Sequence, residues 1–517
     1  MQSRTTWSHI PIFRQYLYVT NDYLLYFRHQ NRCLRHKIVV FVTKSSHPLH
    51  SFYRHTRVAY FCVAKTKIIM VAPSWIRLDN AAIIYPSCRT RRYAAQFRMS
   101  VTLDDEISIR LLNEALQNII GRFPGFTYTL GNGFFWWYLH RLDNMPVAER
   151  NTTMNIFSIK DNGGYMFKAG CKGRRITLDI FHALADGHGA LTFLLSLTAE
   201  YLRLKEGIEP EYGGWILNPR ESALPEELED SFDSFSGLKG SLDKEDAAWH
   251  IPGRKEPFDV LHDIRITLSS EAVAAKAREK GCTVTEYITA LMLASLQDTR
   301  NASGTRRQRG NLKVEVPVDL RKMFGKKTLR NFSSYVHLGF DASKGDLSLD
   351  EIIKVVRAQK ASFIQKAPLT TRVAANVALE DNVAVRCIPR LIKKPIINLV
   401  NRVKGDRYCT HTLSNVGDIK LPASVAEHVR DIDFILGRQL SRSGACACAS
   451  FGGRLNLNFT RSIAESAFER YFLGWLDRVG LEPSVQLYDV AEHQTAAQTA
   501  LPMQRVRIGW SGTPFVI

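Results

Sequence analysis

One short stretch of the chain places a histidine, an aspartate and two glycines at a spacing that suits acid–base chemistry. The stretch FHALADGHGA contains His182, Asp186, Gly187 and Gly189. A neutral imidazole has a pKa of about 6.5, so it can take a proton from an alcohol or an amine at neutral pH and pass it to a leaving group. His182 is therefore our candidate general base. The alternative is a loop histidine that only packs against its neighbours.

A predicted strand and a predicted helix flank this motif. The run RRITLDIF is typical of a strand and ends directly before His182, and the run that follows Gly189 predicts a helix ending near Gly207. His182 then lies in a strand-to-helix loop, where the glycines allow a tight turn. This position strengthens the interpretation, because loops held by regular elements often carry functional side chains.

The sequence around the motif predicts two halves joined by a long connection. In the first half, residues 104–122 carry apolar side chains at helical spacing, and two β-rich runs flank a Gly-Asn-Gly turn at 131–133, which predicts a hairpin. Residues 208–258 are dominated by acids, Ser, Pro and Gly, which is typical of a connection. Strands alternate with helices, yet several strand pairs resemble hairpins, so we expect a mixed sheet.

In the second half, predicted strands again alternate with predicted helices. Thr283 and Glu286 form a predicted capping box at the start of one helix. Further helices are predicted near 349–365, 385–403 and 463–478. The fold class is therefore α/β, and the predicted domains are an N-terminal half at 70–207 and a C-terminal half at 259–490.

The two ends of the chain differ from the rest in composition. Residues 1–69 hold 11 Lys and Arg, a single acid and six of the fifteen His, and they contain no Gly or Glu. We predict that this basic segment is not part of the folded body; the alternative is a basic arm that contacts membranes or nucleic acid. Residues 491–517 predict a loosely ordered tail.

Composition argues against several other classes of protein. No apolar run approaches the roughly 18–20 residues that span a bilayer, and no G-x-x-x-x-G-K-[ST] or G-x-G-x-x-G motif occurs. The nine cysteines are scattered without C-x-x-C pairs or zinc spacing, so we expect no metal and a reduced, cytoplasmic setting. Residues 1–69 carry +10 of the net charge of +19, and the rest of the chain carries only +9, which weakens a nucleic-acid interpretation.

Several blocks of the sequence resemble the superfamily of CoA-dependent acyltransferases that includes chloramphenicol acetyltransferase, plant acyltransferases and the condensation domains of peptide synthetases. Within it, the resemblance is to the alcohol acetyltransferase-like group, over roughly residues 74–485. The blocks, in order, are WIRLDNAAIIYP, RFPGF, GFFWWYL, HALADGHG, VPVDLRKMFGKKTLRNF, TLSNVGDIKLP and DFILG. The superfamily signature is H-H-x-x-x-D-G. Phe181 replaces its first His here, and the second, catalytic His aligns with His182.

The resemblance implies two chloramphenicol-acetyltransferase-like subdomains, each a mixed sheet flanked by helices, that meet over a tunnel with His182 midway. It also implies transfer of an acyl group, acetyl being the expected one, from acetyl-CoA or another acyl-CoA to a small-molecule alcohol, or alternatively an amine. Two rivals stay open: a carrier-protein-dependent condensation or lipid-esterifying transferase, and a non-catalytic binding protein on the same scaffold. We expect no nucleic-acid partner and at most peripheral membrane contact.

For Asp186 the resemblance implies a salt bridge to an arginine that holds the loop, whereas the spacing alone would also allow a His–Asp relay. Arg122, in RFPGF, is the first choice of partner, and Arg321 is the second. For the oxyanion of the tetrahedral intermediate, the family pattern suggests the Ser414 hydroxyl, with the Gly187 amide as a second donor. The plainer alternative is that the polar residues around Ser414 cap a turn.

Two basic segments carry weaker predictions. Lys326, Lys327 and Arg330 could form a rim that attracts the CoA phosphates, the alternative being a solvated loop. Residues 390–404 are basic and amphipathic, which fits either a helix on a membrane surface or a helix packed on the core, and Pro395 and the frequency of core-facing helices favour packing.

Overall fold

The computed structural model describes residues 72–90, 93–150, 154, 156–241, 244–258, 260–304, 310–400, 406–439 and 442–489, and the backbone of three short strands nearer the N-terminus. The chain divides into two compact units, Met1–Val71 and Ala72–Ile517. In the first unit the described strands form one antiparallel sheet: β1 (Tyr18–Val19), β2 (Leu24–Phe27) and β3 (Ile38–Phe41). That residues 1–69 are dispensable stays a prediction, and the predicted tail at 491–517 lies outside the described residues.

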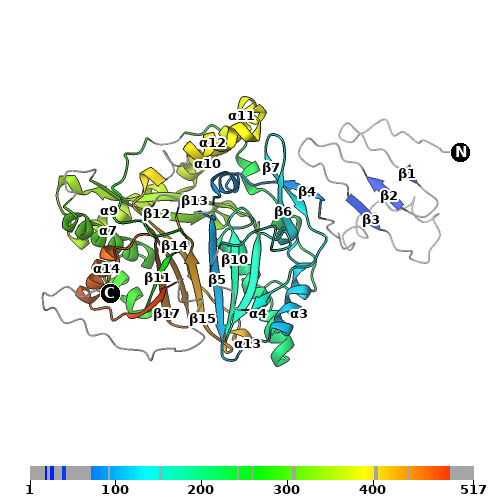
Figure 1. The fold of residues 1–517 in the computed structure, drawn as a ribbon, viewed down its shortest axis with the longest axis horizontal. Helices are drawn as coiled ribbons and strands as arrows, with labels where there is room; N and C mark the ends of the chain where they lie inside the picture. Colours follow the sequence, from blue (N-terminus) through cyan, green and yellow to red (C-terminus); the bar gives the residue numbers. More distant parts are fainter. Residues whose placement is uncertain are drawn as a thin grey trace, which may run out of the picture. The chain divides into compact units, whose positions relative to one another are not determined.

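A five-stranded mixed sheet forms the first half of the second unit, in the order β15-β5-β10-β9-β8 (Figure 1). Its strands are β5 (Gln96–Leu103), β8 (Glu149–Arg150), β9 (Phe167–Lys172), β10 (Arg175–Phe181) and β15 (Val429–Leu436). Helices α3 (Ile109–Ile120) and α4 (Gly187–Glu206) pack together against this sheet. Gly207 ends α4 in the left-handed conformation, as the sequence predicts, which a glycine adopts at little cost.

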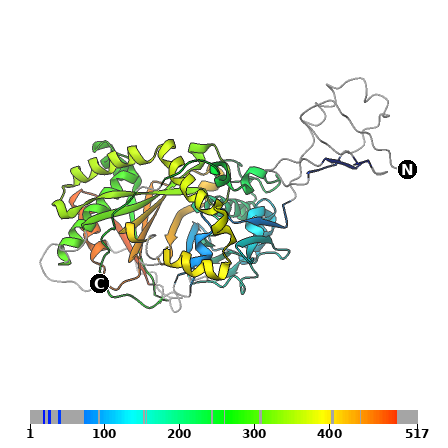
Figure 2. The ribbon, with the colours of Figure 1, turned by 90° about the horizontal axis from the view of Figure 1, so that it is seen from above.

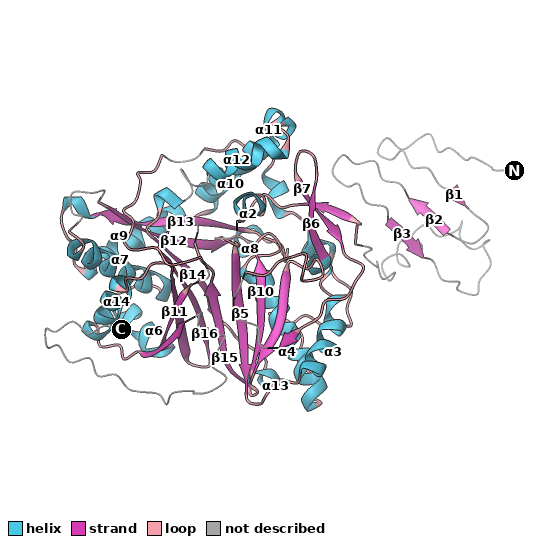
Figure 3. Cartoon of the chain, viewed as in Figure 1, coloured by secondary structure: helices cyan, strands magenta, loops and turns pink. Residues whose placement is uncertain are grey.

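A seven-stranded mixed sheet forms the second half, in the order β13-β12-β14-β16-β17-β11-β18 (Figure 3). Its strands are β11 (His262–Ser269), β12 (Asn311–Asp319), β13 (Ser333–Asp341), β14 (His411–Asp418), β16 (Gly444–Phe451), β17 (Arg454–Arg461) and β18 (Ser484–Asp489). Four helices cover its apolar face: α6 (Ser270–Glu279), α7 (Val284–Ala302), α9 (Leu349–Phe363) and α14 (Ala467–Arg478). The predicted capping box at Thr283 and Glu286 starts α7.

The predicted fold class is confirmed: the second unit is α/β, with two mixed sheets flanked by helices. The two sheets are joined through β15, which follows β14 in the chain but pairs with β5 of the first sheet. Asn458 of β17 donates to the carbonyl of Phe434 in β15 at 2.8 Å, so β15 also contacts the second sheet. The sequence predicts β15 as a strand but carries no signal for this change of sheet.

A small third sheet consists of β4 (Trp75–Arg77), β6 (Tyr128–Asn132) and β7 (Trp137–Arg141). The predicted hairpin is confirmed, but its turn is misplaced: β6 runs through Gly131, and the loop comprises residues 133–136. Gly131 instead leaves room for the ring of its cross-strand partner Tyr138, because a Cβ there would lie 2.5 Å from that ring.

Three consecutive helices follow α9, where the sequence predicts one. They are α10 (Lys366–Asp381), α11 (Val383–Cys387) and α12 (Arg390–Val400). Pro389 breaks the predicted helix at 385–403, because proline lacks an N–H and disfavours helical backbone in the residue before it. The remaining short elements are α2 (Ile84–Cys88), η2 (Pro124–Thr127), α5 (Pro225–Leu228), η3 (Ser231–Phe235), α8 (Arg321–Phe324), η4 (Ala342–Lys344), η6 (Asp406–Tyr408) and α13 (Ala423–Ala426). Within the described residues, no helix has the length and apolar character needed to cross a bilayer.

Candidate active site

His182 lies directly after β10, and its ring is held between two aromatic side chains. Its backbone N–H donates to the carbonyl of Ala95 at 2.9 Å. The imidazole stacks on Tyr85, with ring centroids 4.4 Å apart, and meets the edge of Phe97 at 5.1 Å. The residues before and after it, Phe181 and Ala183, are fully buried, whereas His182 stays partly exposed. The two aromatic contacts therefore fix the orientation of the ring.

A hydrogen-bonded chain sets the tautomer of this imidazole. His182 Nδ1 lies 3.1 Å from Asn331 Oδ1, and Asn331 Nδ2 lies 3.3 Å from Asp79 Oδ2. An ionised carboxylate only accepts, so the Asn331 amide must turn its N–H groups to Asp79 and its oxygen to His182. The ring proton then sits on Nδ1. Nε2 keeps its lone pair and can act as a base.

The electrostatics favour a neutral imidazole beside an ionised carboxylate. Burial lowers the pKa of His182, and the hydrogen bonds to its own backbone and to Asn331, with the charge of Asp186, offset only part of this effect. Burial raises the pKa of Asp79 to about 6 against the opposing effect of Arg330. At pH 7 His182 is thus neutral and Asp79 is largely ionised.

Asp186 holds the loop instead of touching the imidazole. Its carboxylate makes two bonds to Arg321, at 2.9 and 3.0 Å, and accepts from the backbone N–H of Phe332 at 2.9 Å and of Gly189 at 3.2 Å. Burial raises the pKa of Asp186, but Arg321 outweighs this and holds it below the usual value. The arrangement fits the implied salt bridge and gives no support to a His–Asp relay.

The first-choice partner for Asp186, Arg122, was wrong. Arg122 lies after α3 and pairs with Glu227 in α5, with Nη2 2.8 Å from Oε1 and both side chains buried. This pair ties the long connection at 208–258 to the first half. Arg321 comes from the start of α8, so the Asp186 pair links the first half to the second half of the chain. Sequence order could not distinguish the two arginines, because each follows a regular element.

The two predicted oxyanion donors lie on neighbouring segments. A Cβ on Gly187 would sit 3.6 Å from Val416 Cγ1, so β14 passes directly beside the start of α4. Ser414 precedes Val416 by two residues, about 7 Å along the strand, and is half-buried. Nearby, Asn415 bonds to Thr285 and to the N–H of Gly417, as the turn-capping alternative expects. Both predicted donors remain proposals.

The predicted basic rim is only partly at the surface. Arg330 is buried and donates to the carbonyl of Arg77 at 2.6 Å, so it was wrong as a phosphate ligand. The guanidinium of Arg330 forms a buried ion pair with Asp79, with Nη2 3.6 Å from Oδ2. Lys326 and Lys327 lie nearer solvent and face acids of the connection, at 3.3 and 3.6 Å.

Tyr85, Asn331 and Asp79 are site residues that sequence reasoning missed. All three occur in sequence blocks that carry the resemblance, WIRLDNAAIIYP and TLRNF. The resemblance of these blocks does not indicate what the individual residues do. Asn331 follows His182 by 149 residues, and a buried amide has no spacing rule that would connect it to a distant histidine.

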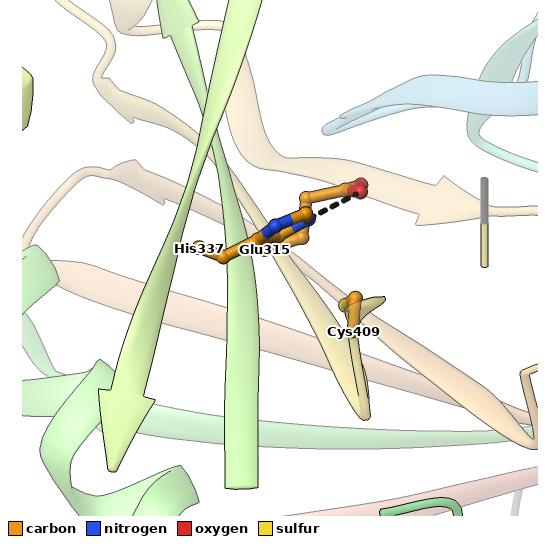
Figure 4. A group of neighbouring side chains, drawn as sticks. All are labelled: Glu315, His337 and Cys409. Carbon is orange, nitrogen blue, oxygen red and sulfur yellow. Dashed lines mark ion pairs between the residues drawn. The ribbon is translucent and has the colours of Figure 1, made fainter. Parts of the chain in front are cut away.

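A second polar cluster lies on β12 and β13 and directly before β14 (Figure 4). It contains Glu315, His337 and Cys409, with one candidate ligand atom from each within 4.8 Å of the others. Burial would lower the pKa of His337, but Glu245 and Glu315 raise it, and burial raises the pKa of Cys409 to about 12. Arg442 Nη1 lies 3.2 Å from both Cys409 Sγ and Glu315 Oε1. An imidazole whose pKa is raised by two carboxylates, a neutral thiol and a guanidinium make a poor cation site among these described residues.

The fold has known relatives among solved structures. Polyketide synthase associated protein 5 from Mycobacterium tuberculosis aligns with a TM-score of 0.51 at 15% identity, over 78% of this chain and 98% of that one. The starter condensation domain of rhizomide synthetase, solved with C8-CoA, gives 0.54 at 12% identity, over 78% and 94%. The trichothecene 15-O-acetyltransferase TRI3 from Fusarium sporotrichioides gives 0.51 at 12% identity, over 78% and 94%. The chain shares this fold.

Comparison of the sequence finds fewer similar proteins than comparison of the fold. No known family model matches the chain. Two uncharacterized proteins of Mycobacterium tuberculosis, MT2362 and Rv2305, are each 27% identical over 262 residues, which is 48% of this chain and 58% of theirs. The match therefore spans somewhat more than half the length of these relatives.

Proposed function

We propose that this chain is a CoA-dependent O-acyltransferase that moves an acyl group, with acetyl the expected one, from the CoA thioester to the hydroxyl of a small alcohol. The observation that carries the proposal is the His182 imidazole, neutral at pH 7, with its Nδ1 proton held by Asn331 and Nε2 left as a base. The expected passage for donor and acceptor between the two halves belongs to the same proposal.

The reaction needs no enzyme nucleophile. The acceptor oxygen attacks the thioester carbon while its proton moves to His182 Nε2, which gives a tetrahedral oxyanion. The C–S bond then breaks, and the imidazolium returns its proton to the thiolate, so ester and free thiol are the products. Ser414 and the Gly187 amide are the candidate donors to the oxyanion.

The similar proteins support the proposed substrate class. One is an O-acetyltransferase by name, and the condensation domain was solved with an acyl-CoA. In the proposal, Lys326 and Lys327 border the CoA phosphates, and Arg330 no longer belongs to that rim. A non-catalytic role on this scaffold is less consistent with an imidazole whose orientation and tautomer are fixed.

The direct experiment is an assay of thiol release from several acyl-CoAs with a panel of alcohols and amines, and identification of products by mass spectrometry. The proposal expects an ester whose formation matches thiol release one to one. Thiol release without acylated product, or no turnover with any pair in a folded preparation, would count against it.

A second candidate is a transferase that takes its acyl group from a carrier protein. A condensation domain and a polyketide synthase associated protein among the similar structures favour this possibility. The two candidates separate when the same acyl group is offered on CoA and on a phosphopantetheinylated carrier. Turnover with the carrier alone would select the second candidate.

A further inference from the structure

Helix α12 presents its apolar side to solvent. Leu391, Ile392, Ile396 and Leu399 are 78%, 56%, 49% and 63% exposed. They follow the i, i+1, i+5 and i+8 spacing that forms a single stripe on a helix. The sequence alternative in which this helix packs its apolar face on the core was therefore wrong. Figure 2 shows α12 and the helices next to it, in yellow, at the outside of the unit.

The polar side of α12 faces the protein, which fixes this inverted orientation. Lys393 is only 3% exposed, and its Nζ lies 3.2 Å from the ring centroid of Trp136. Burial lowers the pKa of Lys393 to about 8. Arg390 donates to the carbonyls of Gly133 and Phe134, at 3.0 and 2.9 Å. Burying an ammonium group costs free energy, and the attraction between Lys393 and the Trp136 ring offsets part of that cost. These contacts hold the polar side of α12 toward the protein.

Neighbouring elements extend the apolar surface. The loop of the β6–β7 hairpin, which α12 contacts through Arg390, carries Phe134 and Phe135, 73% and 43% exposed. Val383 at the start of α11 is 72% exposed. Single exposed apolar side chains are ordinary, but a contiguous group of this kind marks a contact surface.

Positive charge borders this surface. Residues 383–405 contain six Lys and Arg and no acid. Of these, Arg390 and Lys393 face the protein, and Arg386 lies 3.7 Å from Asp381, so the charge at this surface that the structure describes is Lys394. Lys394 is exposed next to the apolar stripe and has no ion-pair partner among the described residues. Apolar side chains that sink below the headgroups, next to cations at headgroup level, are the features of a helix that lies in the surface of an anionic bilayer.

We propose that the α12 patch, defined as Phe134, Phe135, Leu391, Ile392, Lys394, Ile396 and Leu399, docks this protein on the surface of an anionic lipid bilayer. A second copy of the chain fits the patch less well, because two such surfaces would oppose their positive charges. Lipid headgroups neutralise that charge and accept the apolar stripe. If the proposed function is correct, docking would place an acyltransferase at a membrane. The docking proposal itself rests only on the residues of the α12 patch and does not depend on acyl transfer.

The test is flotation of the full chain with vesicles of phosphatidylcholine, alone or with about 30% phosphatidylserine. We expect binding to the anionic vesicles that weakens as the NaCl concentration is raised, because salt screens the attraction. The double variant L391Q/L399Q should lower the bound-to-free ratio by at least about tenfold, since two apolar side chains no longer enter the bilayer. K394E should lower it by about fivefold.

Matched controls remove exposed side chains of the same types elsewhere. L238Q/L487Q replaces leucines that are 46% and 60% exposed, and K344E reverses an exposed lysine; both should float like the parent. Circular dichroism and thermal melting confirm that each variant is folded. The proposal would be overturned if the parent does not float with anionic vesicles, or if L391Q/L399Q floats as well as the parent. It would also be overturned if the parent self-associates without binding vesicles and L391Q/L399Q loses that self-association. Binding is read without substrate, so either result is independent of acyl transfer.

Discussion

At the scale of single residues, the account depends on how one imidazole is oriented. The H-x-x-x-D-G pattern identifies His182 from the sequence, because the motif is local and lies between predictable elements. Its tautomer could not be predicted, since Asn331 and Asp79 reach it from distant parts of the chain. The motif therefore identifies the proposed base but not the groups that set its tautomer.

Replacing Asn331 with alanine tests this positioning role. We expect kcat to fall by about tenfold, with little change in KM for the acyl donor, because the ring loses its fixed tautomer but no substrate contact. Asn331 also raises the pKa of His182. The acid limb of the pH–rate profile, which lies below about 6.5 in the parent, should therefore move to lower pH.

A purely structural role for Asn331 predicts a different result. The variant would lose folded protein, yet the surviving molecules would keep the parental pH profile. That outcome would remove Asn331 from the mechanism.

At the scale of elements, the loop after α8 and the first turn of α4 are joined through one carboxylate. Asp186 caps α4 through the N–H of Gly189 and binds Arg321 and the N–H of Phe332 on the second segment. The sequence predicts that Asp186 is structural only through resemblance. Its partner could not be chosen, because a salt bridge between distant segments leaves no periodic signal.

Asp186→Asn should destabilise the fold more than it changes the chemistry. It removes the buried carboxylate of the Arg321 ion pairs and leaves the half-exposed Asp319, 2.9 Å from Arg321 Nη1. Loss of one partner of a buried ion pair typically costs up to about 3–5 kcal/mol. Urea unfolding should show this loss in the free energy of unfolding, together with a low folded yield. Full stability with only a large fall in kcat would favour the His–Asp relay.

At the scale of the whole molecule, charged groups are buried where the two sheets meet. Arg265 of β11 lies 3.0 Å from Asp433 of β15. Asp263, also on β11, is buried near Asp433, and burial, followed by the charge of Asp433, raises its pKa to about 7. The halves, their helices and most strands could be predicted from periodicity, but this ionic contact could not, because it depends on β15 joining the other sheet.

Asp263→Asn should stabilise the protein in a pH-dependent way. The folded pKa of about 7 exceeds the unfolded value of about 3.9. The native state therefore binds more protons than the unfolded state between those values, and the stability that Asp263 contributes is lost as pH rises through 7. At pH 8 the variant should be more stable than the parent by up to about 4 kcal/mol, with a smaller difference at pH 5. Equal or lower stability of the variant at pH 8 would show that the site accommodates the charge.

The most direct test of the central claim compares His182, in the loop after β10, with His188, in the first turn of α4. His182→Ala removes the proposed base, and His188→Ala removes a partly exposed histidine that packs beside Trp215. With acetyl-CoA and an accepted alcohol, thiol release by the first variant should fall by about 10²–10⁴-fold, while the second stays within a few-fold of the parent, both with parental melting temperatures. Turnover by folded His182→Ala at the parental rate would contradict the account.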